Sequence, residues 1–282
     1  MIYDLVLALL IAGLIAYAGY RARALTWDGA VAACLVGASV FGFGGLAAAI
    51  LLVLFFASSS VLSFVGKRNV RKQQAEETFD KGGKRDAAQV LANGGVAAAA
   101  LVLAGTIGNP IAPLMFGAFV GALAEATADT WATEIGVLSK TPPRLVTTGR
   151  RVQAGTSGGL TLLGTGAGVL GAATIGLFAA GSLALFPSLW PFGGGVAQPG
   201  LSLILAALAG GAIGMLVDSL LGATLQASYF CPQCSKPTES RLHRCGTPTT
   251  LVRGVQWLTN DVVNLAGTFV GASVGLLVVW IA

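Results

Sequence analysis

Residues 157–181 read SGGLTLLGTGAGVLGAATIGLFAAG and contain no charged side chain. An α-helix needs about 20 mainly apolar residues to cross the hydrocarbon core of a bilayer. The stretch therefore predicts a membrane-spanning helix. Its many glycines and alanines are typical of helices that pack closely against one another in a membrane.

The composition of the whole chain agrees with this prediction. Of its 282 residues, 55% are hydrophobic and 10% are charged, whereas a soluble domain carries about 25% charged residues. Because so few charges cannot cover a water-facing surface, a soluble globular protein is excluded. The net charge of +5 would suggest nucleic-acid binding in a soluble protein. In a membrane protein it reflects basic loops, and we expect no nucleic-acid partner.

Eight segments are long and apolar enough to be spanning helices. They lie at about 3–20, 28–44, 46–65, 87–105, 111–129, 157–181, 200–221 and 260–281. The apolar stretch 182–199 is interrupted by three prolines, so we expect a loop or a partly re-entrant segment there. The predicted fold class is all-α, a polytopic transmembrane bundle of about eight helices that forms a single domain over residues 1–282.

The basic residues orient this bundle. All 17 lysines and arginines fall in the connections after the first, third, fifth and seventh segments. By the positive-inside rule, these connections are cytoplasmic and both termini lie outside. The first segment lacks the basic start of a secretory signal, and we expect it to be retained as a helix. The compact length and the lack of a transit peptide favour a bacterial inner membrane.

Acidic residues gather at the predicted cytoplasmic ends of three segments, where ionisable groups are costly and often functional. The acids and the amides beside them are Glu125, Asp129, Glu134, Asp218, Asn260, Asp261 and Asn264. Mg²⁺ is typically held by one or two carboxylates together with substrate phosphates and waters. The constellation predicts a magnesium site for a phosphorylated substrate. The alternative is that these acids cap helices or pair with loop arginines.

A glycine-rich turn follows three arginines before the sixth segment. The residues concerned are Arg144, Arg150, Arg151 and the turn Gly155, Thr156, Ser157, Gly158 and Gly159. Such a turn at a helix N-terminus presents N–H groups to an anion, and Thr156 or Ser157 could cap the helix. The turn lacks the lysine of a Walker A loop, so a simple flexible cap remains an alternative.

A polar stripe enters the fourth segment. Lys84 and Arg85 precede it, and Arg85, Gln89 and Asn93 repeat at every fourth residue. Such a stripe faces a bundle interior or a cavity rather than lipid. The alternatives are anchoring by positive charge for Lys84 and Arg85, and interhelical hydrogen bonds for the two amides. The charged run 67–77 is interpreted as a solvated cytoplasmic segment.

A cysteine-rich motif lies in the loop between the last two segments. Cys231, Cys234, His243 and Cys245 form a CxxC pair followed by HxC within residues 227–256, and His243 is the single histidine of the chain. Three thiolates and an imidazole complete the coordination sphere of a structural zinc ion. In a reducing cytoplasmic loop a disulfide is disfavoured. A redox-active CxxC pair and unreactive thiols remain alternatives.

Five of these motifs together resemble one membrane family. They are KRDAAQVLANGG (84–95), ADTWATEIG (128–136), PRLVTTGRRVQAGTSGG (143–159), DSLLGATLQ (218–226) and NDVVN (260–264). The family includes phytyl-phosphate kinase and was long catalogued only as a domain of unknown function. The resemblance runs from about residue 25 to the end. A more distant similarity links the chain to CTP-using polyprenol kinases and phosphatidate cytidylyltransferases.

The resemblance implies transfer of a phosphoryl group from a nucleoside triphosphate, with CTP as the expected donor, to an isoprenoid monophosphate such as phytyl phosphate. The diphosphate would feed tocopherol, phylloquinone or chlorophyll-type synthesis. The Cys₃His insert departs from members that lack it and leaves open whether the substrate is the same.

We assign roles on this hypothesis. Asp129, Glu134, Asp218 and Asp261 would be Mg²⁺ ligands, with Glu125 beside them. The 155–159 turn with Arg144 and Arg150 would hold the triphosphate, and Lys84 and Arg85 the acceptor phosphate or the donor. Gln89, Asn93, Asn260 and Asn264 would orient the ligands, and the apolar bundle would take the prenyl tail.

Two other classes remain open. A CTP-dependent cytidylyltransferase acting on a lipid phosphate would share this site and release pyrophosphate. A transporter or channel would suit intramembrane acids and abundant glycine, but it predicts charges through the membrane depth, whereas these cluster at one face. A purely structural membrane protein would not need five acids at one level.

Overall fold

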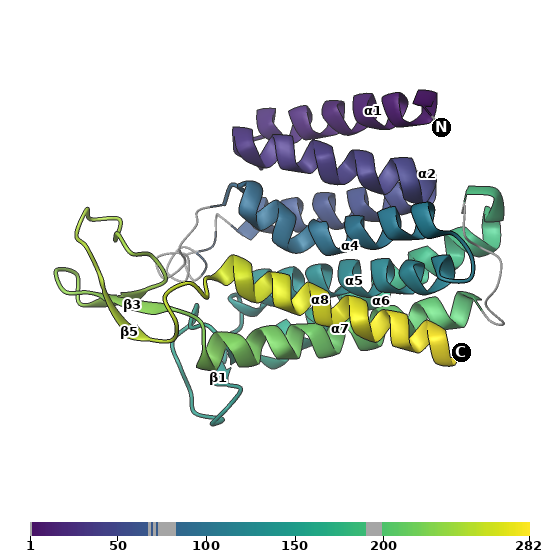
Figure 1. Ribbon diagram of the computed structural model, residues 1–282. Coiled ribbons are helices and arrows are strands. Elements are labelled where there is room, and N and C mark those ends of the chain that lie inside the picture. Colours follow the sequence, from purple (N-terminus) through teal and green to yellow (C-terminus); the bar gives the residue numbers. More distant parts are fainter. Residues whose placement is uncertain (1, 67–68, 70–71, 73–82, 190–198) are drawn as a thin grey trace.

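The computed structural model describes residues 2–66, 69, 72, 83–189 and 199–282. Within these residues the chain forms a bundle of α-helices with short strands at one end (Figure 1). The helices are α1 (Ile2–Arg21), α2 (Trp27–Gly66), α4 (Ala87–Ile107), α5 (Ala112–Gly136), α6 (Leu162–Leu185), α7 (Pro199–Thr224) and α8 (Asn260–Ile281). Both chain termini lie at the end opposite the strands. The predicted all-α membrane bundle is confirmed.

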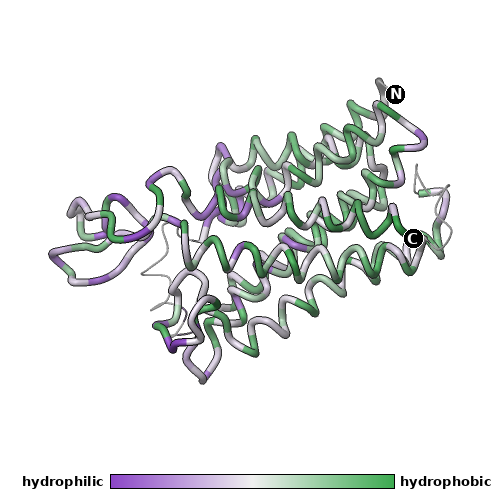
Figure 2. The backbone as a smooth tube through the Cα atoms, turned by 60° about the horizontal axis from the view of Figure 1, so that its bottom comes forward, coloured by the Kyte–Doolittle hydropathy of each residue, from purple (hydrophilic) through white to green (hydrophobic). Residues whose placement is uncertain are grey.

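The helices have the lengths and composition that a bilayer requires. Five of the described helices, α2, α4, α6, α7 and α8, are long and apolar enough to cross a membrane. The apolar part of α1, Leu5–Arg21, is shorter. Figure 2 shows that apolar residues line the length of the bundle and that most hydrophilic stretches gather at the end with the strands.

Helix α2 is two antiparallel helices joined at Gly45. Gly45 has φ 72° and ψ −174°, inside the 40 residues of α2, and this region of backbone space is accessible almost only to glycine. After the turn the chain runs back towards the start of α2, because a Cβ placed on Gly19 would lie 3.1 Å from Phe56, in the second half of α2, and 3.0 Å from Leu25, two residues before α2. The predicted spans 28–44 and 46–65 are therefore separate, and the described helices provide eight apolar segments.

Helix α5 lies at the centre of the bundle. It contacts α4, α6, α7 and α8 and is buried almost throughout from Ala112 to Ala128. Its approach to α8 is very close, because a Cβ on Gly121 would lie 2.2 Å from the carbonyl oxygen of Gly271. Small residues thus allow these backbones to touch, as expected for membrane helices. With its acidic C-terminal half, α5 is not among the five described helices that are long and apolar enough to cross a membrane.

The sixth helix begins later than predicted. Gly159–Leu160 (β2) pairs with Arg144–Leu145 (β1) in an antiparallel ladder, so these residues cannot be helical. Helix α6 begins at Leu162, and the Thr161 hydroxyl accepts a hydrogen bond from the Gly164 N–H at 3.0 Å. The prediction of a helix from 157, capped by Thr156 or Ser157, is wrong for this reason.

The stretch 182–199 is only partly described. Helix α6 continues to Leu185, and a 3₁₀ turn follows at Pro187–Leu189. Residues 190–198 lie outside the described residues, and α7 begins at Pro199.

The segment predicted as a polar insert contains a small antiparallel sheet. Its strands are β3 (Ser228–Cys231), β4 (Lys236–Thr238) and β5 (Thr250–Arg253), in the order β4-β3-β5. The sheet contacts the end of α7 directly, because the Arg253 guanidinium of β5 donates to the Gly222 carbonyl of α7 at 3.0 Å. This sheet is the projection beside the bundle in Figure 1.

Candidate functional site

A cavity of about 270 Å³ opens at the end of the bundle near the strands, where α5 and α7 end and α4 and α8 begin. Polar residues from each of these helices line it, together with the glycine-rich turn. The predicted site residues that line it are Arg85, Gln89, Asn93, Asp129, Glu134, Gly155, Thr156, Ser157, Gly158, Gly159, Asp218, Asn260, Asp261 and Asn264. Segments far apart in the sequence thus meet in one place, as their spacing predicted.

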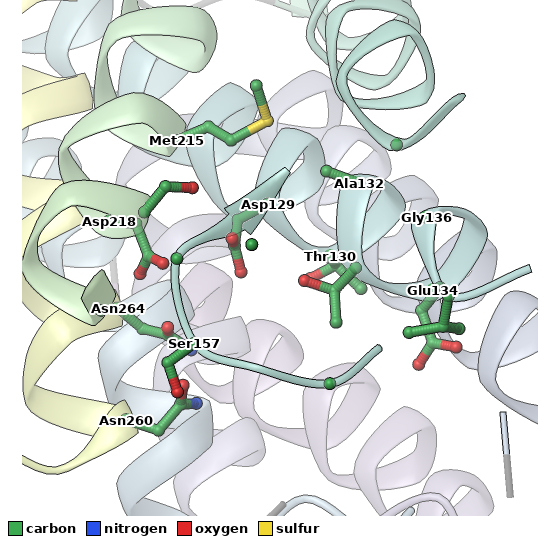
Figure 3. A pocket seen from close by; sticks show the side chains of 18 of the residues that line it. Asp129, Thr130, Ala132, Glu134, Gly136, Ser157, Met215, Asp218, Asn260 and Asn264 are labelled. Atoms are coloured by element: carbon green, nitrogen blue, oxygen red, sulfur yellow. The ribbon is translucent and has the colours of Figure 1, made fainter. Parts of the chain in front are cut away.

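Asp129 of α5 and Asp218 of α7 lie on the same side of this cavity (Figure 3). They are close enough for their charges to interact. With its amide oriented so that the nitrogen faces α7, Asn264 donates to Asp218 Oδ2 at 3.0 Å. Within the described parts of the chain, neither carboxylate forms an ion pair. Two like charges without a basic partner favour a bound cation.

Glu134 lies apart from these two acids in the same view. It forms an ion pair with Lys72, whose side chain is 4% exposed, and accepts a hydrogen bond from the Ser63 hydroxyl. The interpretation of 67–77 as a solvated segment is therefore wrong at Lys72, and most of that segment lies outside the described residues. Because Glu134 already has a cationic partner, it is a poorer candidate for a metal ligand than Asp129 or Asp218.

Glu125 does not line the cavity. It is 1% exposed and packs against glycines of α7 and α8, since a Cβ on Gly214 would lie 2.3 Å from its Cγ and one on Gly267 would lie 2.5 Å from Oε1. Its Oε1 accepts no hydrogen bond from the described residues. Glu125 is thus enclosed by helices, one turn deeper than Asp129, and the expectation that it belongs to the site is not supported by its position.

Three predicted basic residues lie outside the cavity. Lys84, Arg144 and Arg150 are exposed and are not among the lining residues. Arg144 instead donates to the carbonyl of Gly149 at 2.9 Å and so closes the tip of its own loop. The contact with a triphosphate predicted for Arg144 and Arg150 finds no support in this arrangement.

The glycine-rich turn lies directly on α7. Gly158 has φ +78°, and a Cβ there would lie 2.5 Å from the Cβ of Ala223 and 2.6 Å from the Ser219 carbonyl oxygen. The N–H groups of Gly155, Ser157 and Gly158 donate to none of the described residues. Because these residues line the cavity and their N–H groups have no acceptor among the described residues, the groups are available to bind an anion there. The turn thus offers donors to a phosphate without being the first turn of α6.

Arg85 is held in place by several contacts. Its N–H donates to the Ala24 carbonyl and its own carbonyl accepts from the Thr26 N–H, both at 3.0 Å. Its guanidinium donates to the Ser60 hydroxyl at 3.0 Å and lies 5.6 Å from the centre of the Phe56 ring. Burial lowers the pKa of this guanidinium, and the charge of Glu134 raises it in part. No described carboxylate forms an ion pair with it, so its charge is available to an anion.

Glu239 is a further residue of the cavity, and it was not among the predicted site residues. It follows β4, and its Oε1 accepts hydrogen bonds from the Ser157 hydroxyl at 2.6 Å and from the Gln226 amide at 2.7 Å. It also lines the cavity. The three-stranded sheet therefore holds the glycine-rich turn through one carboxylate. Nothing in the local sequence around Glu239 signals this contact.

The four predicted zinc ligands come together in the sheet. The ligand atoms of Cys231, Cys234, His243 and Cys245 all lie within 4.8 Å of one another. The sulfurs of Cys231 and Cys245 are 3.7 Å apart. Two thiolates on one tetrahedral zinc, each at about 2.3 Å, lie roughly 3.8 Å apart. The cluster is therefore compatible with a structural zinc site.

The contacts within the cluster shift the pKa values of two of its thiols in opposite directions. Hydrogen bonding with Thr247, and to a smaller extent with His243, lowers the pKa of Cys245 to about 6. The pKa of Cys234 is raised to about 11, because Cys234 forms a hydrogen bond with Cys245 and is partly desolvated. One thiol is thus ready to bind as thiolate, the form that ligates zinc.

Comparisons with known proteins identify the family. The sequence profile of the integral membrane protein family DUF92 matches residues 10–272. The chain belongs to the DUF92 family. This membership confirms the predicted resemblance to a membrane family known as a domain of unknown function. No solved structure matches the chain significantly.

Two relatives show how far the DUF92 similarity extends. Protein PGR of Arabidopsis thaliana is 35% identical over 273 residues, which cover 93% of this chain and 91% of the relative. An uncharacterised membrane protein of Methanocaldococcus jannaschii is 31% identical over 264 residues, which cover 92% and 87% respectively. Neither name states an activity.

Proposed function

We propose that this DUF92 protein is a Mg²⁺-dependent membrane kinase that transfers a phosphoryl group from a nucleoside triphosphate, with CTP as the expected donor, to an isoprenoid monophosphate such as phytyl phosphate. The observation that carries this proposal is the content of one cavity. Asp129 and Asp218, two carboxylates without a basic partner among the described residues, share it with three open N–H groups of the glycine-rich turn and with Arg85.

The carboxylates suit magnesium. Mg²⁺ prefers oxygen ligands and is usually held by one or two carboxylates plus substrate phosphates. Asp129 and Asp218 would hold it, with Asp261 at the start of α8 as a further acid of the cavity wall. Bound there, Mg²⁺ would neutralise charge on the phosphates. The hydrogen bond from Asn264 keeps the Asp218 carboxylate oriented.

The reaction needs positioning more than acid–base chemistry. An oxygen of the lipid monophosphate attacks the γ-phosphorus, and the bond between that phosphorus and the β,γ-bridging oxygen breaks. The products are a lipid diphosphate and a nucleoside diphosphate. The turn 155–159 binds the triphosphate through its N–H groups, and Arg85 binds the acceptor phosphate. Because the acceptor is already an anion, no general base is required.

The same cavity would face the cytoplasm. It lies at the end of the bundle that carries the basic connections, and such connections remain on the cytoplasmic side. Nucleoside triphosphates are made in that compartment, so the donor would reach the turn directly. We propose a bacterial inner membrane as its location.

A product assay tests the proposal. Purified protein in detergent is incubated with geranylgeranyl or phytyl monophosphate, Mg²⁺ and each γ-labelled triphosphate in turn, and lipid products are separated by chromatography. We expect labelled prenyl diphosphate and the matching nucleoside diphosphate, with the highest rate for CTP. A nucleotide-linked lipid with release of pyrophosphate would instead identify a cytidylyltransferase, and no product with any donor would contradict both enzymes.

The role of the turn predicts the effect of Gly158→Ala. A Cβ at this position collides with α7, so the turn must move. Its N–H groups would then no longer be placed to donate to the nucleotide phosphates. Hydrogen bonds to charged groups contribute about 1.5–3 kcal/mol each, and we expect the KM for the nucleotide to rise about 10- to 100-fold. Steady-state kinetics with varied nucleotide measure this.

Gly149→Ala is the matched control for that substitution. Gly149 also has a positive φ, +66°, but a Cβ there meets no atom within 4 Å. The two variants share the backbone strain and differ in the collision with α7. We expect a KM within about threefold of wild type for Gly149→Ala. Equal effects of the two variants would contradict a role for the position of the turn.

A further inference from the structure

A second cavity adjoins the first and is almost entirely apolar. It has a volume of about 100 Å³ and lies between α1, both halves of α2 and the start of α4. Of its lining residues, three are polar, Arg85, Gln89 and Asn93, and all three also line the first cavity. The two cavities therefore meet along one stripe of α4.

The second cavity reaches the lipid-facing surface. Ile11 and Ile15 of α1 and Val53 of α2 line it and are 37%, 40% and 39% exposed. Along α4 its lining extends from Arg85 to Gly94, about 14 Å at a rise of roughly 1.5 Å per residue. Its length and its open side suit a single hydrocarbon chain that lies along the groove and remains partly in contact with lipid.

Arg85 stands at the border between the two cavities. Its guanidinium lies beside the Phe56 ring of the apolar wall and close to the polar cavity, without an ion-pair partner among the described residues. A site with a cation at the junction of a polar and an apolar cavity fits an amphiphile that has an anionic head and a single apolar tail. Its phosphate would lie at Arg85 on the polar side, and its tail on the apolar side.

We infer that the groove between α1, α2 and α4 binds the hydrocarbon tail of the lipid monophosphate, with the phosphate anchored by Arg85 at its inner end. This inference rests on the proposed function, because it names the place where the acceptor of that reaction binds. It also makes a separate claim about binding, which can be measured without turnover.

Photolabelling tests the binding claim directly. The probe is a 20-carbon isoprenoid monophosphate with a diazirine near the end of its tail, irradiated with the full-length protein in lipid nanodiscs. We expect cross-links in the groove walls, on residues 11–16 of α1 and 41–56 of α2. An excess of unlabelled geranylgeranyl monophosphate should remove them, and geranylgeraniol, which lacks the phosphate, should not. Cross-links confined to other helices would overturn the inference, as would equal competition by the alcohol or by phosphatidic acid.

Groove-filling variants provide a second readout. Ala33 and Ala49 line the groove from the two halves of α2, and we expect Ala49→Leu to reduce groove labelling at least about tenfold. Ala33→Leu is a second such variant should Ala49→Leu fail to elute as a folded monodisperse species. Ala18→Leu is the matched control, because Ala18 is exposed and does not line the groove. Wild-type labelling by all three variants would contradict the tail site.

The same variants separate this inference from the proposed function. In the kinase assay, Ala49→Leu should raise the KM for the 20-carbon acceptor about tenfold or more and leave the KM for a five-carbon prenyl phosphate unchanged. Groove labelling without turnover by any triphosphate would support the tail site and contradict the kinase. Turnover of the 20-carbon acceptor that is unaffected by either groove variant would support the kinase and contradict the tail site.

Discussion

Asp218→Asn should lower the turnover number of the proposed kinase by about 10²–10³-fold. The substitution keeps the size of the side chain and its acceptor oxygen but removes the charge that would hold Mg²⁺ against the phosphates. Removal of a single group that stabilises transition-state charge costs about 10²–10³-fold in other enzymes. Asp129 lines the same cavity, so Asp129→Asn should have a comparable effect. Single-turnover kinetics at saturating nucleotide measure it.

Asp28→Asn is the control for these variants. Asp28 is an exposed acid in the first turn of α2, outside the cavity, and its carboxylate accepts hydrogen bonds from Thr26 and from the Ala87 N–H. The carboxylate uses a different oxygen for each bond, so the single amide oxygen of asparagine can accept from the Ala87 N–H while its NH₂ group donates to the Thr26 hydroxyl. We expect turnover within about twofold of wild type and unchanged elution in detergent. Activity of Asp218→Asn close to that of this control would contradict the metal-ligand role.

Cys231→Ser should abolish zinc binding and lower kcat/KM by about 10²-fold. Cys231 is buried in β3, and loss of one ligand from a structural site removes metal and folding energy together. The sheet then no longer holds Glu239 against Ser157 and Gln226. A displacement of about 1 Å at a site of positioning can cost 10²-fold in rate. Metal analysis and the kinase assay on the same sample measure both effects.

Cys34→Ser is the matched control for the zinc prediction. Cys34 lies in α2, and its thiol contacts the Leu9 carbonyl at 3.9 Å rather than the cluster. This variant should retain one zinc per chain and full activity. Glu239→Gln should keep the zinc and lose about tenfold in kcat/KM, because only the link between the sheet and the turn is weakened. Full activity of zinc-free Cys231→Ser would show that the sheet does not support the site.

Local sequence patterns predicted much of this arrangement. Apolar runs separated by basic connections identified the helices, and the spacing of Arg85, Gln89 and Asn93 placed one stripe of α4 on the cavity. The CxxC and HxC pairs predicted the metal cluster, because zinc ligands with short spacing converge within one loop. These features depend on residues close in sequence, where periodicity and spacing carry the information.

The features that the sequence did not predict depend on distant contacts. Lys72 lies in a charged run typical of a solvated linker, and its burial results from pairing with Glu134, 62 residues away. Thr161 rather than Ser157 caps α6, because the strand pairing of Gly159–Leu160 with Arg144–Leu145 decides where the helix can begin. Arg144 donates to Gly149 within its own loop, and Arg150 and Arg151 of that loop are exposed. Composition and spacing contain no sign of these pairings.

The acidic central helix has a consequence for biogenesis. A helix that carries Glu125 near its middle and Asp129 and Glu134 towards its end gains less from entering a bilayer alone, since an acid at the centre of a span costs about 2.5–3.5 kcal/mol during insertion by the translocon. The neighbours of α5 shield these groups only after they have assembled around it. Helix α5 should therefore partition into the membrane together with α4 or with the later helices, and a truncated nascent chain that ends just after α5 should insert it poorly.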